Sequence, residues 1–401
     1  MNNNGTIDNS VRVRVLRTES ELEEIRDIWM QWQQHPNSNR NFYLTIVGAR
    51  PETIRPHVIV VYRGPRPDAL LIGRVEQNDV HFKLGYMTIC RVRTRSLVFI
   101  YKGLLGNDCS DNAQTLLLEI SKALQEHEGD VALLSSFGTE SPMYTCAKQV
   151  IGLRSWSYFD DPQSHWSITL PTSFDEFLHR LPTKVRRNRK QEANKLLRDF
   201  SGSVTITCFS KCSEIETMID DVESIAKKTY HRGLGVGFVA NEENRRRFVT
   251  AAKQGQLRGY VLYVASRPCA FMIGTLYAGT FYGDFMGYDP AHQRYSPGTF
   301  LLLRIINDLC SIGAKRVDFG FGDAWYKEHF CDCEWKESSI HMYAPTAKGI
   351  LLMVLQNCTS FINRTGTNIL RRSNLILHAK RTWRRLNTGG GATAAYRGRA
   401  S

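Results

Sequence analysis

The sequence has few of the features that mark a membrane protein or a disulfide-stabilised protein. No uninterrupted apolar run approaches the roughly 18 residues that a membrane-spanning helix requires. Ten cysteines are spread through 401 residues, which is too sparse for a disulfide framework. The opening stretch, MNNNGTIDNS, lacks the basic and apolar regions of a signal peptide. We therefore expect a protein of the reducing cytoplasm.

Two kinds of catalytic or metal motif are also missing. The run HFCDC, from His329 to Cys333, has a Cys-x-Cys spacing without the second ligand pair that zinc sites usually have, so we predict no metal. No strand-elbow motif surrounds a serine, which leaves a Ser-His-Asp hydrolase unsupported.

The net charge of +13 is unevenly distributed along the chain. Residues 346–401 contain ten Lys and Arg and no Asp or Glu, which leaves 42 basic against 39 acidic residues elsewhere. The basic excess therefore belongs to a C-terminal segment. We expect this segment to bind either an anionic membrane surface or tRNA. Binding to the membrane surface would make the protein peripheral to the membrane. We expect no sequence-specific DNA binding.

The most informative stretch runs from residue 279 to residue 335. Residues 280–288 alternate as a strand, residues 297–313 have a helix-starting proline and a helix-ending glycine, and residues 316–321 alternate as a second strand. Open α/β sheets bind ligands where such strands end. The polar residues that follow the second strand are Asp323, Tyr326 and Lys327.

Three segments of this region carry a family resemblance. YDPAHQRYSPGTFLLL, DFGFGDAWYKEHF and the basic PTKVRRNRKQEANKL together resemble the CelD-like acyltransferases of the GNAT superfamily, over residues 166–342. The resemblance implies a transferase that takes an acyl group, with acetyl as the first expectation, from acyl-CoA. The acceptor would be an amine or hydroxyl of a sugar, a polysaccharide precursor or another small molecule.

A weak internal repeat, spaced by about 185 residues, suggests two related halves. LLLEI at residues 116–120 corresponds to LLLRI at residues 301–305, and a strand follows each. We predict an α/β (α+β) fold of two tandem GNAT-like domains, each a mixed central sheet flanked by helices, with a C-terminal helical extension.

The expected boundaries follow from composition and pattern. We predict a disordered N-terminus at 1–10, a degenerate GNAT-like half at 11–160, the acyltransferase half at 161–345, a basic helical extension at 346–386 and a flexible tail at 387–401. Within the extension we expect an apolar helix at 350–362, a break at Gly366 and a basic helix at 368–386.

The loop QRYSPGT is the candidate donor site. Proteins of the GNAT superfamily hold the pyrophosphate of acyl-CoA on backbone amides at the start of a helix, where the helix dipole favours an anion. Arg294 would add charge and Gly298 would allow a close approach, with Ser296 and Thr299 completing the loop. The alternative is a surface turn that starts a helix with proline.

Two side chains are candidates for moving protons. Asp323 would act as a base or orient the acceptor, and Tyr326, which matches a tyrosine frequent in GNAT proteins, would protonate the departing thiolate. Alternatively, Asp323 caps the next helix and Tyr326 packs beneath it. The other candidate substrate contacts are Asp284, Tyr288, Lys327, Arg187 and His231.

These contacts have structural alternatives. Lys327 would otherwise be a solvated or paired charge, and the basic helix that includes Arg187 would be a solvated face. Two further functions also remain open: a transferase that uses aminoacyl-tRNA, as the two-half peptidoglycan-bridge transferases do, and a non-catalytic scaffold that binds a membrane or polyanion through its basic helix.

Overall fold

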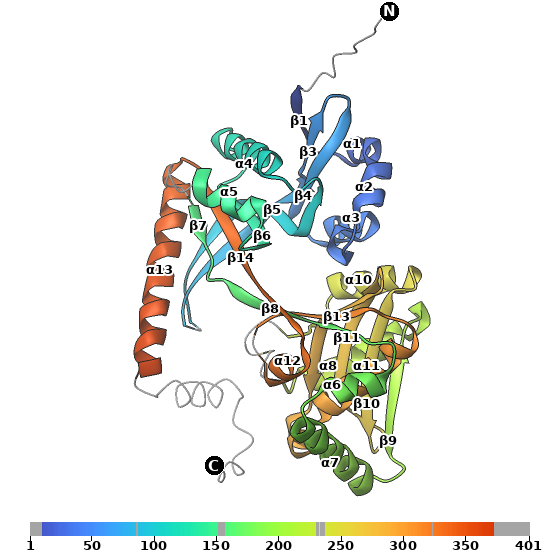
Figure 1. Ribbon diagram of the computed structural model, residues 1–401. Coiled ribbons are helices and arrows are strands. Elements are labelled where there is room, and N and C mark those ends of the chain that lie inside the picture. Colours follow the sequence, from blue (N-terminus) through green and yellow to red (C-terminus); the bar gives the residue numbers. More distant parts are fainter. Residues whose placement is uncertain are drawn as a thin grey trace, which may run out of the picture.

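The computed structural model describes residues 10–85, 87–150, 157–229, 232, 237–322 and 324–372, and only the backbone of the last six. Within them, fourteen strands form one continuous sheet, and most of the helices cover its faces in two lobes (Figure 1). The main strand order is β1-β3-β4-β5-β6-β14-β8-β13-β12-β11-β10-β9. The predicted α/β class with mixed sheets is therefore confirmed.

The N-terminal lobe is built on a long, curved hairpin. Its strands are β1 (Val11–Leu16), β2 (Thr53–Pro56), β3 (Val58–Arg63), β4 (Arg66–Leu84), β5 (Met87–Gly106), β6 (Val131–Gly138) and β7 (Ser157–Phe159). Its helices are α1 (Glu19–Glu24), α2 (Arg26–Trp32), α3 (Arg40–Ala49), α4 (Ser110–Gln125) and α5 (Pro142–Val150), with the 3₁₀ turn η1 (Pro36–Ser38). Apolar cores lie on both faces of this part of the sheet.

The C-terminal lobe repeats the same plan. Its strands are β8 (Gln163–Thr169), β9 (Val204–Phe209), β10 (Leu257–Val264), β11 (Arg267–Tyr277), β12 (Thr280–Tyr288), β13 (Arg316–Phe321) and β14 (Cys333–Tyr343). Its helices are α6 (Phe174–Arg180), α7 (Thr183–Asp199), α8 (Ile215–Ala226), α10 (Glu242–Lys253), α11 (Pro297–Ser311) and α12 (Trp325–Phe330), with the 3₁₀ turns η2 (Cys212–Glu214) and η3 (Pro290–Tyr295).

The two lobes contain the same supersecondary unit. In each, two parallel strands are joined by a helix, β5–α4–β6 in the first lobe and β12–α11–β13 in the second. A short helix, α5 or α12, follows each unit. The repeat noted in the sequence falls on these elements, as two related halves require.

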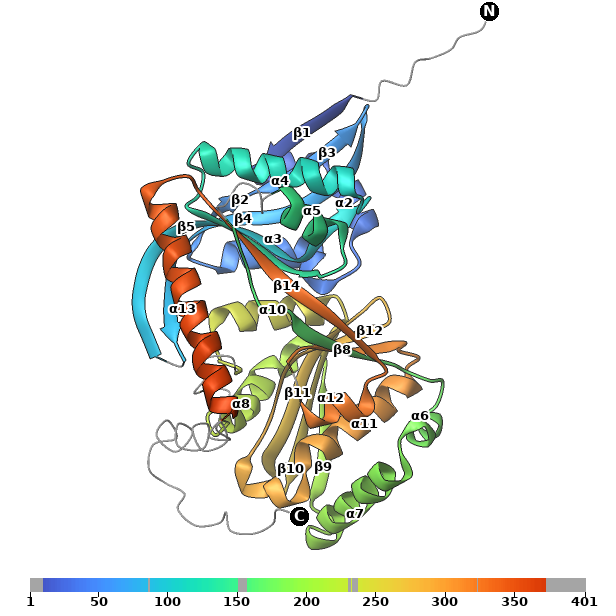
Figure 2. The same ribbon diagram turned by 60° about the vertical axis from the view of Figure 1, so that its left-hand side comes forward.

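Strands β8 and β14 join the lobes. Strand β14 pairs with β6 of the first lobe along one part of its length and with β8 along another. Both strands run from one lobe to the other in two views of the molecule (Figure 2). Backbone hydrogen bonds therefore hold the two halves in one sheet.

The C-terminal extension differs from the prediction. A single helix, α13 (Ala347–Arg372), packs beside the first lobe and continues through Gly366 (Figure 2). The predicted break was wrong because one helical glycine costs only about 1 kcal/mol relative to alanine. The rest of the predicted basic helix, 373–386, lies outside the described residues. No described helix is long and apolar enough to span a bilayer.

Candidate active site

A gap opens in the sheet between β12 and β13. These strands pair in parallel only from Thr280 to Tyr282 and from Arg316 to Asp318. Beyond that point β12 stays on β11, while β13 stays on β8, so the two strands separate. A cavity of about 480 Å³ lies here, which we call the strand-gap cavity. Its lining includes Asp284, Met286, Tyr288, Gly298, Phe319, Phe321, Tyr326 and Lys327.

A bulge in β12 directs a carboxylate into this cavity. Gly283 pairs with Gly274 and Phe285 pairs with Ile273, so the backbone of Asp284 has no pairing partner on β11. Asp284 forms an ion pair with Arg247 of α10, and 19% of its side chain is exposed. Burial raises the pKa of Asp284, and the nearby Arg247 only partly offsets this effect.

The start of α11 opens into a second, adjoining cavity. Ser296 precedes the helix in the left-handed conformation, with φ 50° and ψ 51°, and no side chain caps the helix. Pro297 has no amide hydrogen, and Phe300 already donates to the Ser296 carbonyl across 3.0 Å. The amides of Gly298 and Thr299 are therefore the donors that remain for a ligand.

This helix-start cavity has a volume of about 280 Å³. It is lined by Met286, Tyr288, Gln293, Ser296, Gly298, Thr299, Leu302 and Tyr326. Five of these residues also line the strand-gap cavity, so the two cavities form one groove. The structure thus brings together the predicted Tyr288, Ser296, Gly298, Thr299 and Tyr326.

Tyr326 lies at the junction of the two cavities. It stands in the first turn of α12, and its hydroxyl donates to the thioether of Met286 at 2.9 Å. The Tyr326 ring packs edge-on against Phe319 of β13, with 5.4 Å between the ring centroids. A thioether is a weak acceptor, so this hydroxyl can exchange its bond for a stronger acceptor in the groove.

Lys327 is buried, and its ammonium forms hydrogen bonds with backbone carbonyl groups. Only 4% of the residue is exposed, and its ammonium donates to the carbonyl oxygens of Phe319, Gly320 and Phe321 at 3.0, 3.2 and 2.6 Å. This burial excludes the solvated charge that was one alternative for Lys327, and leaves a paired charge open. The ammonium therefore binds the end of β13. Lys327 also lines the strand-gap cavity, and its contact with a substrate stays a prediction.

Two of the other predicted site residues lie away from both cavities, and two lie outside the described residues. Arg294 donates to the Tyr295 hydroxyl at 2.6 Å and covers that ring, and it lines neither cavity. Arg187 is exposed on α7, also outside both cavities. Asp323 and His231 lie outside the described residues, so their predicted roles stay predictions. Asp323 follows Gly322 and precedes Ala324, and both of these neighbours line the strand-gap cavity.

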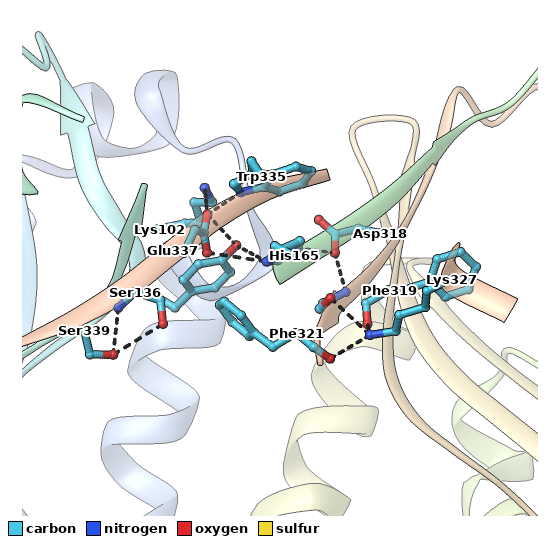
Figure 3. A network of polar contacts seen from close by, with 12 residues as sticks. Lys102, Ser136, His165, Asp318, Phe319, Phe321, Lys327, Trp335, Glu337 and Ser339 are labelled. Carbon is cyan, nitrogen blue, oxygen red and sulfur yellow. Dashed lines mark hydrogen bonds and ion pairs between the residues drawn. The ribbon is translucent and has the colours of Figure 1, made fainter. Parts of the chain in front are cut away.

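A buried polar cluster at the seam between the lobes was not predicted (Figure 3). His165 of β8 has 1% of its side chain exposed and lies between two carboxylates. Its Nε2 is 2.7 Å from Asp318 Oδ1, and its Nδ1 is 3.4 Å from Glu337 Oε2. Trp335 stacks on the imidazole, with 4.4 Å between centroids and 17° between planes.

The cluster is stabilised by its charges. Burial alone would lower the pKa of His165, but the contacts with the Asp318 and Glu337 carboxylates raise it above its usual value. Burial alone would raise the pKa of Glu337, but His165 and Lys102 lower it to about 2. Glu337 also accepts bonds from Lys102 Nζ at 3.1 Å and from Trp335 Nε1 at 2.7 Å.

The cluster could not have been found from local patterns. Its members come from β5, β8, β13 and β14, which are far apart in the chain. The only indication in the sequence was the alternation of β13, which predicted that Asp318 faces away from Val317 and Phe319. Among the described residues, no group of three or more His, Cys, Asp and Glu side chains is arranged to hold a metal ion.

Comparisons with known proteins agree with this geometry. A family model described as "Acetyltransferase (GNAT) domain" matches residues 183–328. A search of curated protein sequences finds no significant match. FemX, a solved structure, has 9% identity and a TM-score of 0.51, with 79% of this chain and 95% of that chain covered.

Two further solved structures have TM-scores of 0.47. L-PGS from Bacillus licheniformis has 13% identity, with 88% of this chain and 99% of that chain covered. A conserved protein of unknown function from Bacteroides thetaiotaomicron has 14% identity, with 83% of this chain and 100% of that chain covered. The narrower CelD-like assignment stays a resemblance, whereas residues 183–328, in the second half of this chain, match the model of a GNAT acetyltransferase domain.

Proposed function

We propose that this protein transfers an acyl group, in the simplest case acetyl, from acyl-CoA to an amine or hydroxyl of a small acceptor. The observation that carries the proposal is the single groove that contains both the start of α11 and Tyr326. The two amides at the helix start suit the pyrophosphate of the donor. The strand gap then suits the acyl-bearing arm.

The arm of acyl-CoA carries amides, which need backbone partners rather than particular side chains. Strand β12 loses its parallel partner after Tyr282, so its edge toward the gap offers backbone groups. The apolar lining from Phe319, Leu301 and Leu302 suits the methylene groups of the arm. A thioester at the inner end of the groove would then lie near Tyr326.

The reaction would be a direct attack. The acceptor nitrogen or oxygen forms a bond to the acyl carbon, the bond from that carbon to sulfur breaks, and the thiolate leaves. The nucleophile loses a proton to a base, which we assign to Asp323 from its sequence position. Tyr326 gives its proton to the departing sulfur.

Calorimetry with CoA and acetyl-CoA tests the donor. Binding of both ligands, with release of free CoA when an acceptor is added, is the expected result. No heat at millimolar ligand would rule out acyl-CoA as the donor.

An aminoacyl-tRNA donor is the second candidate, and the surface of α7 favours it. Lys184, Arg187 and Lys190 are exposed on this helix. Cations that replace phosphate counterions make binding strongly dependent on salt. Binding of tRNA that weakens at least tenfold between 50 and 200 mM salt, roughly the dependence of two or more phosphate contacts, would support this donor. Salt-insensitive binding would exclude it.

Membrane association through the C-terminal region is the third candidate. Helix α13 exposes Leu351, Val354, Phe361 and Ile362, of which Phe361 is 70% exposed. Such an apolar row beside a basic segment is typical of helices that lie on anionic membranes. Charge reversal at Arg371, Arg372, Arg384 and Arg385 should abolish binding to anionic vesicles and leave acyl transfer unchanged. If the variant still binds, the basic segment is not the anchor.

A further inference from the structure

A third cavity, of about 390 Å³, lies at the seam between the two lobes. We call it the seam cavity. Three aromatic side chains line it, together with two cations and one carboxylate. These residues are Trp32, Tyr282 and Trp335, then Lys102 and Arg316, and Asp318.

The seam cavity lies across the sheet from α11. Phe281, Val317 and Phe319 belong to the apolar core beneath α11. Tyr282 and Asp318 alternate with them along the strands and therefore face the opposite side, where they line the seam cavity. The last paired residues of β12 and β13 are Tyr282 and Asp318 themselves.

This position makes the seam cavity adjacent to the groove. On each strand, the residue directly after that last pair lines the strand-gap cavity. These residues are Gly283 on β12 and Phe319 on β13. A group at the inner end of the groove and a group in the seam cavity would therefore meet where the strands separate.

One of the two carboxylate oxygens of Asp318 is available to accept a hydrogen bond from a ligand. Its Oδ1 is 2.7 Å from His165 Nε2 and accepts from the Gly320 amide at 2.8 Å. No hydrogen bond to Oδ2 is found among the described residues, and 13% of the side chain is exposed at the cavity wall. The carboxylate is thus fixed on one side and open on the other.

His165 keeps that carboxylate in place. The imidazole stacks on Trp335 and its Nδ1 contacts Glu337, which leaves its Nε2 directed at Asp318. Figure 3 shows the chain of contacts from Glu337 through His165 to Asp318. Such support for a site residue by buried neighbours restricts its orientation.

We infer that the seam cavity binds the acceptor, and that the acceptor is a monosaccharide-class ring with a nucleophilic amine or hydroxyl. The inference rests on the proposed acyl transfer. Aromatic faces suit the apolar faces of a sugar ring, and the polar groups between them suit its hydroxyls. Asp318 Oδ2 accepts a hydrogen bond from the nucleophile and orients it toward the groove. His165 is a positioning residue that acts through Asp318.

Glucosamine is the probe, and ethanolamine, which has an amine and a hydroxyl but no ring, is the comparator. Calorimetry on the full chain should show glucosamine binding at least tenfold more tightly than ethanolamine. Tyr282→Leu, which removes one aromatic wall and leaves Asp318 and His165 in place, should weaken glucosamine binding about tenfold. Equal binding of the two amines would overturn the assignment of a ring acceptor.

Two variants test the carboxylate and its support. Asp318→Asn should lower transfer to glucosamine at least a hundredfold and change the Kd for acetyl-CoA less than twofold. His165→Gln should lower kcat at least tenfold and change the KM for glucosamine less than threefold, because the acceptor still binds but is misoriented. Asp79→Asn, at an exposed carboxylate of β4, is the matched control. Full transfer by Asp318→Asn would overturn the proposal.

Separate titrations with acetyl-CoA and glucosamine distinguish the two proposals. If acetyl-CoA binds and glucosamine does not, the acceptor site is wrong and the acyl-CoA donor stands. If glucosamine binds in an Asp318-dependent way and acetyl-CoA does not, the proposed donor is wrong, and with it the role of the seam cavity in acyl transfer.

Discussion

The Lys327 ammonium on α12 donates to the Phe321 carbonyl at the end of β13 across 2.6 Å. The same ammonium reaches the carbonyls of Phe319 and Gly320. The bend after β13 includes two glycines with positive φ, Gly320 at 63° and Gly322 at 88°. Lys327 therefore ties this bend to the helix that carries Tyr326.

Lys327→Met should lower the free energy of unfolding by about 1–3 kcal/mol, because one buried and two partly buried carbonyl groups would lose their donor. It should also lower kcat, because the bend next to Tyr326 would be less well held. Urea denaturation followed by activity assays would measure both effects. Lys253→Met, at an exposed position of α10, should change stability by less than about 0.5 kcal/mol. Equal stability of the two variants would contradict this role.

Tyr326→Phe should lower kcat by about 10²–10⁴, the range typical of losing a general acid. The Kd for acetyl-CoA should stay within twofold, because the ring still packs on Phe319. Steady-state kinetics would measure kcat, and calorimetry would measure the Kd for acetyl-CoA. Tyr263→Phe is the control, because the Tyr263 hydroxyl bonds Asp221 at 2.5 Å and lines neither cavity of the groove. An unchanged kcat for Tyr326→Phe would remove Tyr326 from the mechanism.

Gly298→Ala should weaken CoA binding about tenfold, or 1.4 kcal/mol. An added Cβ would lie 3.4 Å from Tyr288 Cδ1, at the wall of the helix-start cavity. The melting temperature should not fall, because alanine favours a helix. Gly48→Ala in α3 is the matched control, since nothing lies within 4 Å of its added Cβ. If both variants bind CoA as the natural protein does, the donor phosphates lie elsewhere.

The seam cluster predicts a specific dependence of stability on pH. The raised pKa of His165 contributes stability that is fully present below the usual value of 6.5 and is lost as pH rises through the raised pKa. The lowered pKa of Glu337 contributes stability that is present above its usual value of 4.5 and is lost as pH falls toward about 2.

Glu337→Gln should therefore lower the pKa of His165, so that its alkaline loss of stability begins at a lower pH. It should also remove the contribution of Glu337 between about pH 4.5 and 2. Denaturation curves over a pH series would show both changes. Glu24→Gln, at an exposed carboxylate paired with Arg14, should leave the pH profile parallel to that of the natural protein. A parallel profile for Glu337→Gln would show that His165 and Glu337 do not interact as described.

Local patterns in the sequence determined much of the second lobe. Strands β12 and β13 have the predicted bounds, and α11 begins at the predicted Pro297. The helix start at Ser296, Gly298 and Thr299 was also recognised. These features depend on alternation and on proline and glycine, whose conformational preferences act over a few residues.

Only the tertiary structure decided which distant residues meet. The pairing of β14 with both β6 and β8 brings Glu337, His165 and Asp318 together, and no local pattern encodes that pairing. The burial of Lys327 likewise depends on where α12 packs against β13. Strand register and helix packing are set by contacts across the whole sheet, so the sequence determined the elements of this site, and the fold determined their chemistry.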